Sequence, residues 1–302
     1  MTEMTLATFK GTILQENFDA LPNSTFGLST DGDPIVVVKF GGNAIMNPKV
    51  LDQLIEDTCS LISKGVRVVL VHGGGTAVND ALKSVGKETQ KIGGLRVTDD
   101  QTLEIAVDVF TGINEKLTDK FLAKGAQALS FCSKTINPFV SKKMEFQDPQ
   151  GNEVDLGWVG EIVDVDATKL DRWLWAGWMP VISPFGKDEN GQLYNLNADH
   201  AALAVATCLN ADALIFLTDV PGVLRDVQDP TTRISHLTPA QAQVCLEEGT
   251  ISGGMLPKIK SCLKCLDNGV ETIAILNSFA PHALLKGFSA PEKYGTVLTR
   301  AS

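Results

Sequence analysis

The 302-residue sequence predicts an α/β protein built on a mostly parallel sheet. Two continuous apolar runs, "IVVVKF" at 35–40 and "VRVVLVH" at 66–72, have the composition of strands that are buried on both faces. A helical pattern with a closing glycine, "PKVLDQLIEDTCSLISKG" at 48–65, separates them. Strands that alternate with helix-length segments in this way are typical of a parallel sheet covered by helices.

The later segments continue the alternation. Residues 98–125 have a long helical pattern, and residues 141–166 alternate apolar and polar side chains around Gly151. The second pattern indicates an antiparallel hairpin inserted over or beside the site. Further strands are expected at 126–131, 179–185, 211–223 and 271–276, and helices at 197–210, 239–251 and 253–269.

The domain organisation follows from two polar, turn-rich stretches. The stretch "PNSTFGLSTDGDP" makes residues 1–33 an N-terminal extension of the α/β domain at 34–302. The stretch "GKDENGQ" divides that domain near Gly186 into two lobes.

Composition excludes several classes of function. The net charge of −10 argues against nucleic acid as a partner. No apolar run approaches the roughly 20 residues that span a bilayer, and the N-terminus lacks the features of a targeting signal, so we expect a cytoplasmic protein. Cys262 and Cys265 have the spacing of one helix face, with no second pair to complete a zinc site, so the prediction is core thiols.

Glycine-rich turns follow the predicted strands. They are "KFGGN" at 39–43, "HGGG" at 72–75 and "GGL" at 93–95. Ligands of open α/β sheets bind beyond the carboxyl ends of the strands, where glycines let backbone N–H groups approach an anion. Two such turns after buried strands favour an anion site over simple tight turns.

Charged and amide side chains accompany these turns. Lys39 and Lys258 can act as point charges on phosphate oxygens, and Arg96 can bind a carboxylate through two N–H groups. The alternative for Arg96 is a salt bridge with Asp99 or Asp100. Segment 194–202 places Asn195, Asn197 and Asp199 on one side of an extended chain, with a helix N-cap as the alternative for Asp199. Asp219 ends another strand, on the expected nucleotide side. Positive donors without a base suit phosphoryl transfer.

The motifs together resemble the amino acid kinase family over residues 35–300. They are "VVVKFGGNAI", "VLVHGGGTAVN", "GGLRVTD", "DLGWVGEI", "NLNADHAALAVA", "LTDVPGVL" and "GGMLPKI", in the family's order. The resemblance implies a three-layer αβα sandwich with two lobes, and ATP that carries Mg²⁺. It implies that residues 34–185 bind the substrate and form dimer contacts, and that residues 186–302 bind the nucleotide. It also assigns catalysis to Lys39, Lys258 and Asp199, with Asp199 orienting the lysines. Substrate binding is assigned to Gly74, Gly75, Arg96, Asn195 and Asn197, and nucleotide binding to Gly41, Gly42 and Asp219.

Within the family, the motifs are most similar to those of members that phosphorylate N-acetyl-L-glutamate in arginine biosynthesis. Two alternatives stay open: a sister kinase for another carboxylate, such as aspartate or a carrier-linked aminoadipate, and a non-catalytic arginine or nucleotide sensor. The segment "CSKTINPF" at 132–139 departs from the family's pattern in that loop. The resemblance implies at least a homodimer, with a hexamer and inhibition by arginine as further expectations.

The N-terminal extension generates a first prediction. The segment "LATFKGTILQENFDAL" could form a helix with Leu6, Phe9, Ile13 and Phe18 on its apolar side, and an isolated helix of this length needs a partner surface. We expect the full chain to be larger than a dimer, and removal of residues 1–30 to yield dimers that arginine inhibits less. Light scattering and arginine titration of both chains measure this. An identical mass and arginine response would mean that the extension has no such role.

Overall fold

The computed structural model describes residues 33–148 and 151–300, so the predicted N-terminal helix lies outside the described residues. Its centre is an eight-stranded sheet in the order β12-β14-β13-β11-β1-β2-β8-β5. β13 and β14 pair antiparallel, and every other pair of neighbours in this sheet is parallel. The predicted mostly parallel sheet is therefore confirmed.

The elements alternate along the chain as the sequence predicts. The strands of the large sheet are β1 Ile35–Phe40, β2 Arg67–His72, β5 Ala128–Phe131, β8 Met179–Ile182, β11 Ala213–Thr218, β12 His236–Leu237, β13 Thr272–Asn277 and β14 Gly295–Thr299. The helices are η2 Gly42–Met46, α2 Pro48–Ile62, α3 Gly75–Ser84, α4 Asp100–Ala123, α5 Ala167–Trp175, α6 Ala198–Cys208, η3 Pro230–Thr232, α7 Pro239–Glu247, α8 Met255–Asp267, α9 Ala283–Ser289 and α10 Pro291–Tyr294.

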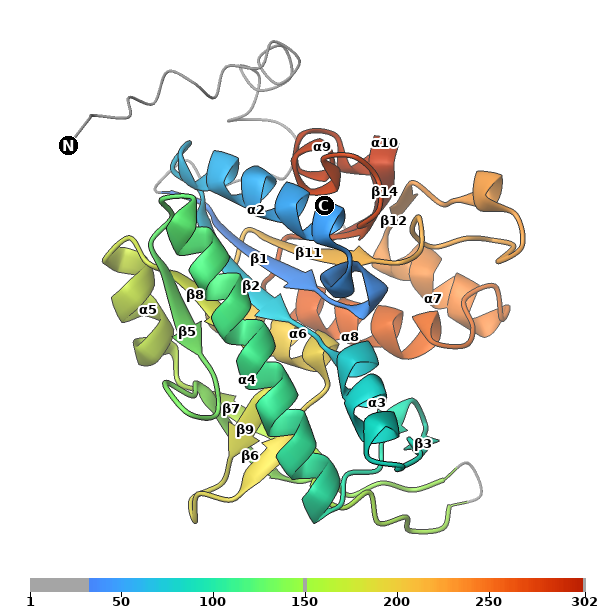
Figure 1. Cartoon of the computed structure of the whole chain (residues 1–302). Coiled ribbons are helices and arrows are strands. Elements are labelled where there is room, and N and C mark those ends of the chain that lie inside the picture. The colour runs from blue at the N-terminus through green and yellow to red at the C-terminus, as the bar shows by residue number, and fades with distance from the viewer. Residues whose placement is uncertain (1–32, 149–150, 301–302) are drawn as a thin grey trace, which may run out of the picture.

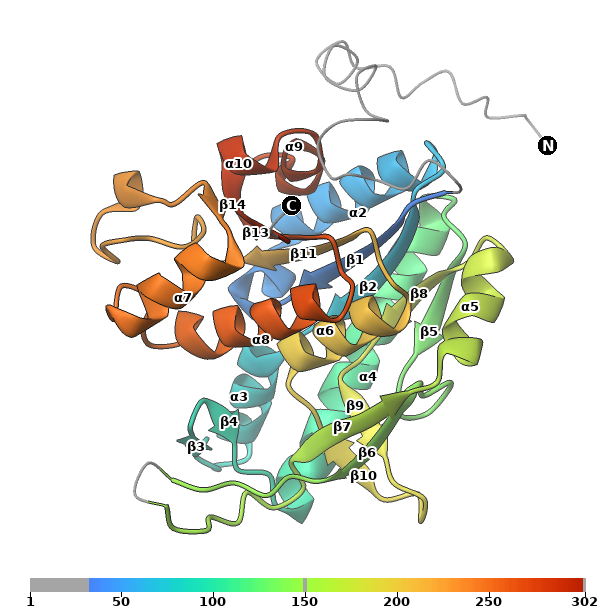
Figure 2. The same cartoon turned by 180° about the vertical axis from the view of Figure 1, so that it is seen from behind.

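Helices cover both faces of the large sheet (Figure 1). Successive side chains of a strand point to opposite faces, so Val36 and Val38 pack in the cluster under α2, α4 and α9. Val37 packs in the opposite cluster, which contains residues of α6 and α8 (Figure 2). Both clusters are closed to solvent, which explains the uninterrupted apolar run of β1. The fold is thus the predicted three-layer αβα sandwich.

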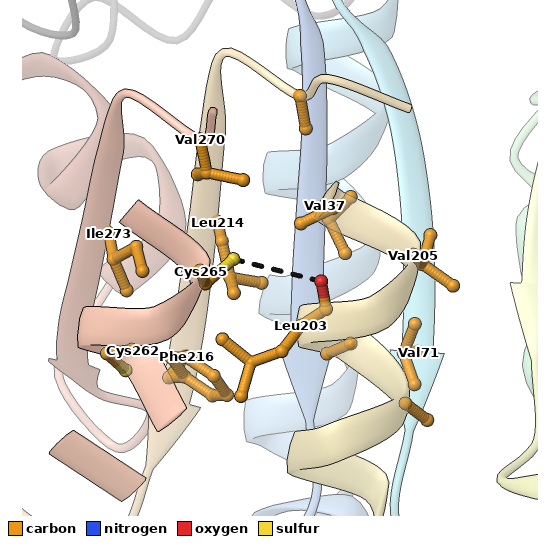
Figure 3. Close-up of a cluster of buried hydrophobic side chains, with 14 of the residues drawn as sticks. Val37, Val71, Leu203, Val205, Leu214, Phe216, Cys262, Cys265, Val270 and Ile273 are labelled. Atoms are coloured by element: carbon orange, nitrogen blue, oxygen red, sulfur yellow. Dashed lines mark hydrogen bonds between the residues drawn. The ribbon is translucent and has the colours of Figure 1, made fainter. Parts of the chain in front are cut away.

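The core beneath α6 and α8 contains the cysteine pair. In Figure 3 Cys262 and Cys265 lie among apolar side chains of β11, β13 and α6, and the Cys265 thiol points to the Leu203 carbonyl oxygen. Both cysteines are buried and unpaired. Burial raises the pKa of the Cys262 thiol. The prediction of core thiols is confirmed.

A second, four-stranded sheet has the order β10-β9-β6-β7. Its β6–β7 pair is antiparallel and comes from the segment predicted to form an inserted hairpin. Residue 186, the predicted lobe boundary, lies within β9, and the division into a substrate and a nucleotide lobe stays a prediction. The remaining strands are β6 Phe139–Lys143, β7 Gly160–Val165, β9 Phe185–Lys187 and β10 Leu193–Asn195, with β3 Lys91–Ile92 and β4 Leu95–Arg96 as a separate hairpin.

A buried acid ties the C-terminal elements to α2. The Asp57 carboxylate lies 2.8 Å from Nδ1 of His282, which has a left-handed backbone at the start of α9, and also accepts the Leu285 N–H. Burial raises the Asp57 pKa, against the opposing effect of His282. The contact fixes α9 over the sheet.

No helix within the described residues is both long enough and apolar enough to span a membrane.

A buried histidine links β2 to α4 and β8. His72 Nδ1 lies 2.9 Å from the Gly73 carbonyl oxygen, and Asn114 Nδ2 lies 3.1 Å from His72 Nε2 and donates to the Val181 carbonyl oxygen. The arrangement fits a neutral ring with its proton on Nδ1. Burial lowers the pKa of His72 to about 4, although the bond to Gly73 opposes this. His72 is therefore a packed, uncharged residue at the end of β2.

Protonation of His72 should oppose folding. The folded pKa lies below the ordinary value near 6.5, so this histidine stabilises the fold above about pH 6.5 and the contribution is lost as the pH falls toward 4. Between pH 7 and pH 5, we expect the free energy of unfolding of wild type to fall by about 2 kcal/mol more than that of His72→Gln. Urea unfolding at both pH values measures this difference. His200, whose pKa burial also lowers, contributes to both proteins. Equal losses would contradict the neutral assignment.

Candidate active site

The candidate site lies at the carboxyl ends of three adjacent strands. β1 is central, with Lys39 paired in register with Phe216 of β11 and Val71 of β2. The "KFGG" and "HGGG" turns therefore follow neighbouring strands, with the Asp219 segment on the other side of β1. In an open α/β sheet this edge is where ligands bind. The first turns of α6 and α8 provide Asp199 and Lys258, and the "HGGG" turn leads into the N-terminus of α3. A helix N-terminus favours anions.

One carboxylate joins the two predicted catalytic lysines. Lys39 Nζ lies 2.9 Å from Asp199 Oδ1, and Lys258 Nζ donates to Asp199 Oδ2. The three side chains are 15%, 12% and 23% exposed, for Lys39, Lys258 and Asp199 respectively. Residues from β1, α6 and α8 thus meet at one point, although as many as 219 positions separate them.

The charges of this cluster support each other. Burial alone would raise the pKa of Asp199, but the ammonium groups of Lys39 and Lys258 and their hydrogen bonds hold it well below its usual range. The carboxylate is therefore ionised at neutral pH. Two cations share one anion, so the cluster retains one positive charge toward the open edge of the sheet.

The glycine turns approach each other as bare backbone. The Gly73 N–H donates to the Phe40 carbonyl oxygen at 2.7 Å. A Cβ on Gly41 would lie 3.2 Å from the Gly73 Cα, and a Cβ on Gly73 would lie 3.3 Å from the Gly41 Cα. Gly42 has φ of +66°, and its Cβ would meet the Asp219 carboxylate at 2.9 Å. The turns need glycine because their backbones and the Asp219 side chain occupy the space.

Gly74 and Gly75 open the helix α3 for different reasons. A Cβ on Gly74 would lie 2.8 Å from Ile113 Cδ1 and 3.0 Å from Phe110 Cε1, so α4 packing requires glycine there. A Cβ on Gly75 would meet only Arg96 Nη2, at 3.9 Å. Packing against α4 therefore explains glycine at Gly74, whereas no close contact within the described residues explains it at Gly75. The sequence could not distinguish the two.

Arg96 reaches the same turn from the β3–β4 hairpin. Its Nη2 donates to the Gly75 carbonyl oxygen at 2.9 Å and its Nη1 to Thr89 Oγ1 at 3.1 Å. Burial lowers the pKa of the guanidinium. The alternative salt bridge is absent from the described residues, because Asp99 pairs with Lys87 and caps α4 instead. Arg96 therefore has N–H groups available for an external carboxylate.

The asparagines divide between two roles. Asn195 Nδ2 donates to Thr98 Oγ1 at 3.2 Å, which brings the end of β10 beside the Arg96 segment. Asn197 is the N-cap of α6, and its Oδ1 accepts the N–H groups of Asp199 and His200. The alternative that Asp199 caps this helix is wrong, since the cap lies two residues earlier and leaves the carboxylate to the lysines.

Asn43 is a site residue that the sequence analysis did not single out. Its backbone N–H and Nδ2 both donate to Asp219 Oδ2, at 3.3 and 3.1 Å, and its Oδ1 accepts from Thr76 Oγ1 at 3.3 Å. The side chain thus joins Asp219, which is expected on the nucleotide side, to the start of α3. Its position directly after two strand-end glycines was the available signal.

Comparisons with known proteins place this geometry in a family. The model of the amino acid kinase family matches residues 34–277. This chain belongs to the amino acid kinase family. It is 39% identical to proteins named acetylglutamate kinase from Methanococcus maripaludis, over 89% of this chain and 92% of the relative, and from Methanocaldococcus jannaschii, over 88% and 90%.

Solved structures place the same chain in the amino acid kinase fold. An N-acetylglutamate synthase from Neisseria gonorrhoeae, complexed with coenzyme A and N-acetyl-glutamate, has a TM-score of 0.79 at 24% identity. The match covers 89% of this chain and 60% of the synthase chain. A carbamate kinase from Giardia lamblia bound to AMP-PNP has a TM-score of 0.63 at 15% identity, over 89% and 99%. At these identities the likeness concerns the fold.

The Asn43 contact generates a prediction about nucleotide binding in this amino acid kinase. Asn43→Asp would set two carboxylates side by side and raise the negative charge where phosphates are expected. We expect the affinity for an ATP analogue to fall at least about tenfold, because the added carboxylate repels the phosphates. A repulsion of about 1.4 kcal/mol corresponds to that factor. Calorimetric titration measures it. Asn47→Ala, which removes only the N-cap of α2, is the matched control. Unchanged affinity in Asn43→Asp would place the nucleotide elsewhere.

Proposed function

We propose that this protein transfers the γ-phosphoryl group of ATP to the side-chain carboxylate of N-acetyl-L-glutamate, in arginine biosynthesis. The observation that carries the proposal is the Lys39–Asp199–Lys258 cluster at the carboxyl edge of the sheet, in a chain 39% identical to acetylglutamate kinases. An intact cluster supports an enzyme rather than a non-catalytic sensor, since a sensor has no need to hold two cations on one anion.

The chemistry explains why the cluster contains cations and no general base. A side-chain carboxylate with a pKa of about 4.3 is already ionised at neutral pH, so no proton has to be removed. Its oxygen forms a bond to the γ-phosphorus while the bond from phosphorus to the β–γ bridging oxygen breaks, giving N-acetyl-L-glutamyl 5-phosphate and ADP. Two anions must approach each other, and Lys39 and Lys258 stabilise the charge of the transferring group.

The substrate is assigned to the side of the turn that Arg96 faces. Backbone N–H groups of Gly74 and Gly75 would approach the reacting carboxylate, at the N-terminus of α3. Arg96 and Asn195 would bind the α-carboxylate, since their segments meet through Thr98. Asn197 would contribute its Nδ2 group, because its Oδ1 is engaged in the α6 cap.

The nucleotide is assigned to the Asp219 side of β1. N–H groups of Gly41 and Gly42 would bind its phosphates. The described residues contain no group of three His, Cys, Asp or Glu side chains that could hold a metal ion. Mg²⁺ commonly binds phosphates, waters and one or two carboxylates, so an ion carried by the nucleotide needs few ligands from the protein. Asp219 is the carboxylate that would face it, and the cation would neutralise phosphate charge.

A substrate panel tests the acceptor. Hydroxylamine traps an acyl phosphate as a hydroxamate, and coupled ADP detection reports turnover. We expect both signals with N-acetyl-L-glutamate, and none with aspartate or an aminoadipate derivative. Preference for either of those would establish the sister-kinase alternative. Cytoplasmic location, a homodimer or hexamer, and an arginine effector accompany the proposal as predictions.

The lysines should act chiefly in the transition state. We expect Lys39→Ala and Lys258→Ala each to lower kcat by about a hundredfold or more, with KM for both substrates little changed, because contacts made chiefly in the transition state affect kcat. Steady-state kinetics measure this. Lys260→Ala, an exposed lysine of α8, is the matched control. If neither active-site substitution changed kcat, the catalytic assignment would be wrong.

Arg96 should distinguish the two substrates. A lysine cannot reproduce the two-pronged binding of a guanidinium to a carboxylate. We expect Arg96→Lys to raise KM for N-acetyl-L-glutamate about fivefold or more and to leave KM for ATP nearly unchanged. Arg225→Lys, on the exposed segment after β11, serves as the control. Equal changes in both KM values would remove Arg96 from the substrate side.

A further inference from the structure

An aromatic ring lies beneath one of the two active-site lysines. Lys258 Nζ is 4.5 Å from the centroid of the Phe216 ring. This distance lies within the roughly 6 Å over which a cation is attracted to the face of an aromatic ring. Phe216 is fully buried in β11 and is the register partner of Lys39, so both side chains point to the same face of the sheet.

The ring also lies between the two helices that supply the other charges. Figure 3 shows Phe216 beside Leu203 of α6 and Cys262 of α8. Leu203 is one turn after Asp199, and Cys262 is one turn after Lys258. Phe216 therefore lies beneath the cluster, beside the residues that follow Asp199 and Lys258 by one helical turn.

The charge balance indicates why a ring is useful there. Asp199 is a single anion for two cations, and Lys258 is largely shielded from water. A lysine side chain has four flexible carbons, so one carboxylate contact alone leaves its ammonium several positions. The Phe216 ring and the Asp199 carboxylate together restrict the Lys258 ammonium to a narrower region.

We propose that Phe216 is a positioning residue for phosphoryl transfer, which holds the Lys258 ammonium in place through a cation–π contact. The proposal rests on the proposed function. Its effect belongs to kcat, because a preorganised cation stabilises the transferring phosphoryl group without an additional rearrangement. Binding of either substrate in the ground state should depend little on the ring.

The test weakens the ring electronically at nearly constant shape. Phenylalanines with one, two and three ring fluorines are incorporated at position 216 of the full chain, which reduces the negative charge of the ring face stepwise. We expect kcat to fall progressively, by about 3- to 30-fold in total, with both KM values within about twofold of wild type. Phe216→Leu, which lacks a ring, should lower kcat by a factor in the same range.

The same series at Phe131 is the control. Phe131 is fully buried in the same cluster as Phe216, and no cation lies over its ring among the described side chains. Its kcat should not change with fluorination. A constant kcat across the series at 216, in an active enzyme, would overturn the positioning role and leave the proposed function intact. A wild type that fails to turn over N-acetyl-L-glutamate would overturn the proposed function, and with it the role of Phe216.

Discussion

The architecture of the site depends on one shared carboxylate. Asp199 contacts Lys39 from the central strand and Lys258 from α8, and its negative charge offsets the repulsion between the two ammonium groups. The contact requires α6 and α8 to begin beside each other at the carboxyl end of β1. The packed layer beneath them, including Leu203 and Cys262, provides that alignment. Core packing and charge placement are therefore a single constraint in this protein.

The sequence predicted the elements whose patterns are local. β1 and β2 are uninterrupted apolar runs because helices cover both sides, and a run of this kind is visible without any partner. The strands β12 and β14, the last two at one side of the large sheet, and the short helices α9 and α10 were not predicted. Their formation depends on distant partners such as Asp57, which lies 225 positions from His282.

The same distinction separates the predicted and unpredicted parts of the site. Lys39 and Lys258 stand in recognisable strand-end and helix-start patterns. Asn43 follows the same strand end, but its role comes from a partner 176 positions away. The reason for glycine at Gly74 was likewise hidden, since it depends on side chains of α4. Sequence reasoning thus identifies which residues can do chemistry but not what fixes each of them.

The contact between Gly41 and Gly73 has a consequence for altering specificity. These two turns belong to hydrogen-bonded neighbouring strands, so the separation between the proposed donor and acceptor subsites is a property of the sheet itself. Arg96 instead stands on a two-stranded ribbon outside that sheet, and its side chain donates to the Gly75 carbonyl oxygen at the start of α3. An engineer who wanted an acceptor with a longer or shorter carbon chain could therefore leave the reaction centre untouched and change the length of residues 91–96 alone.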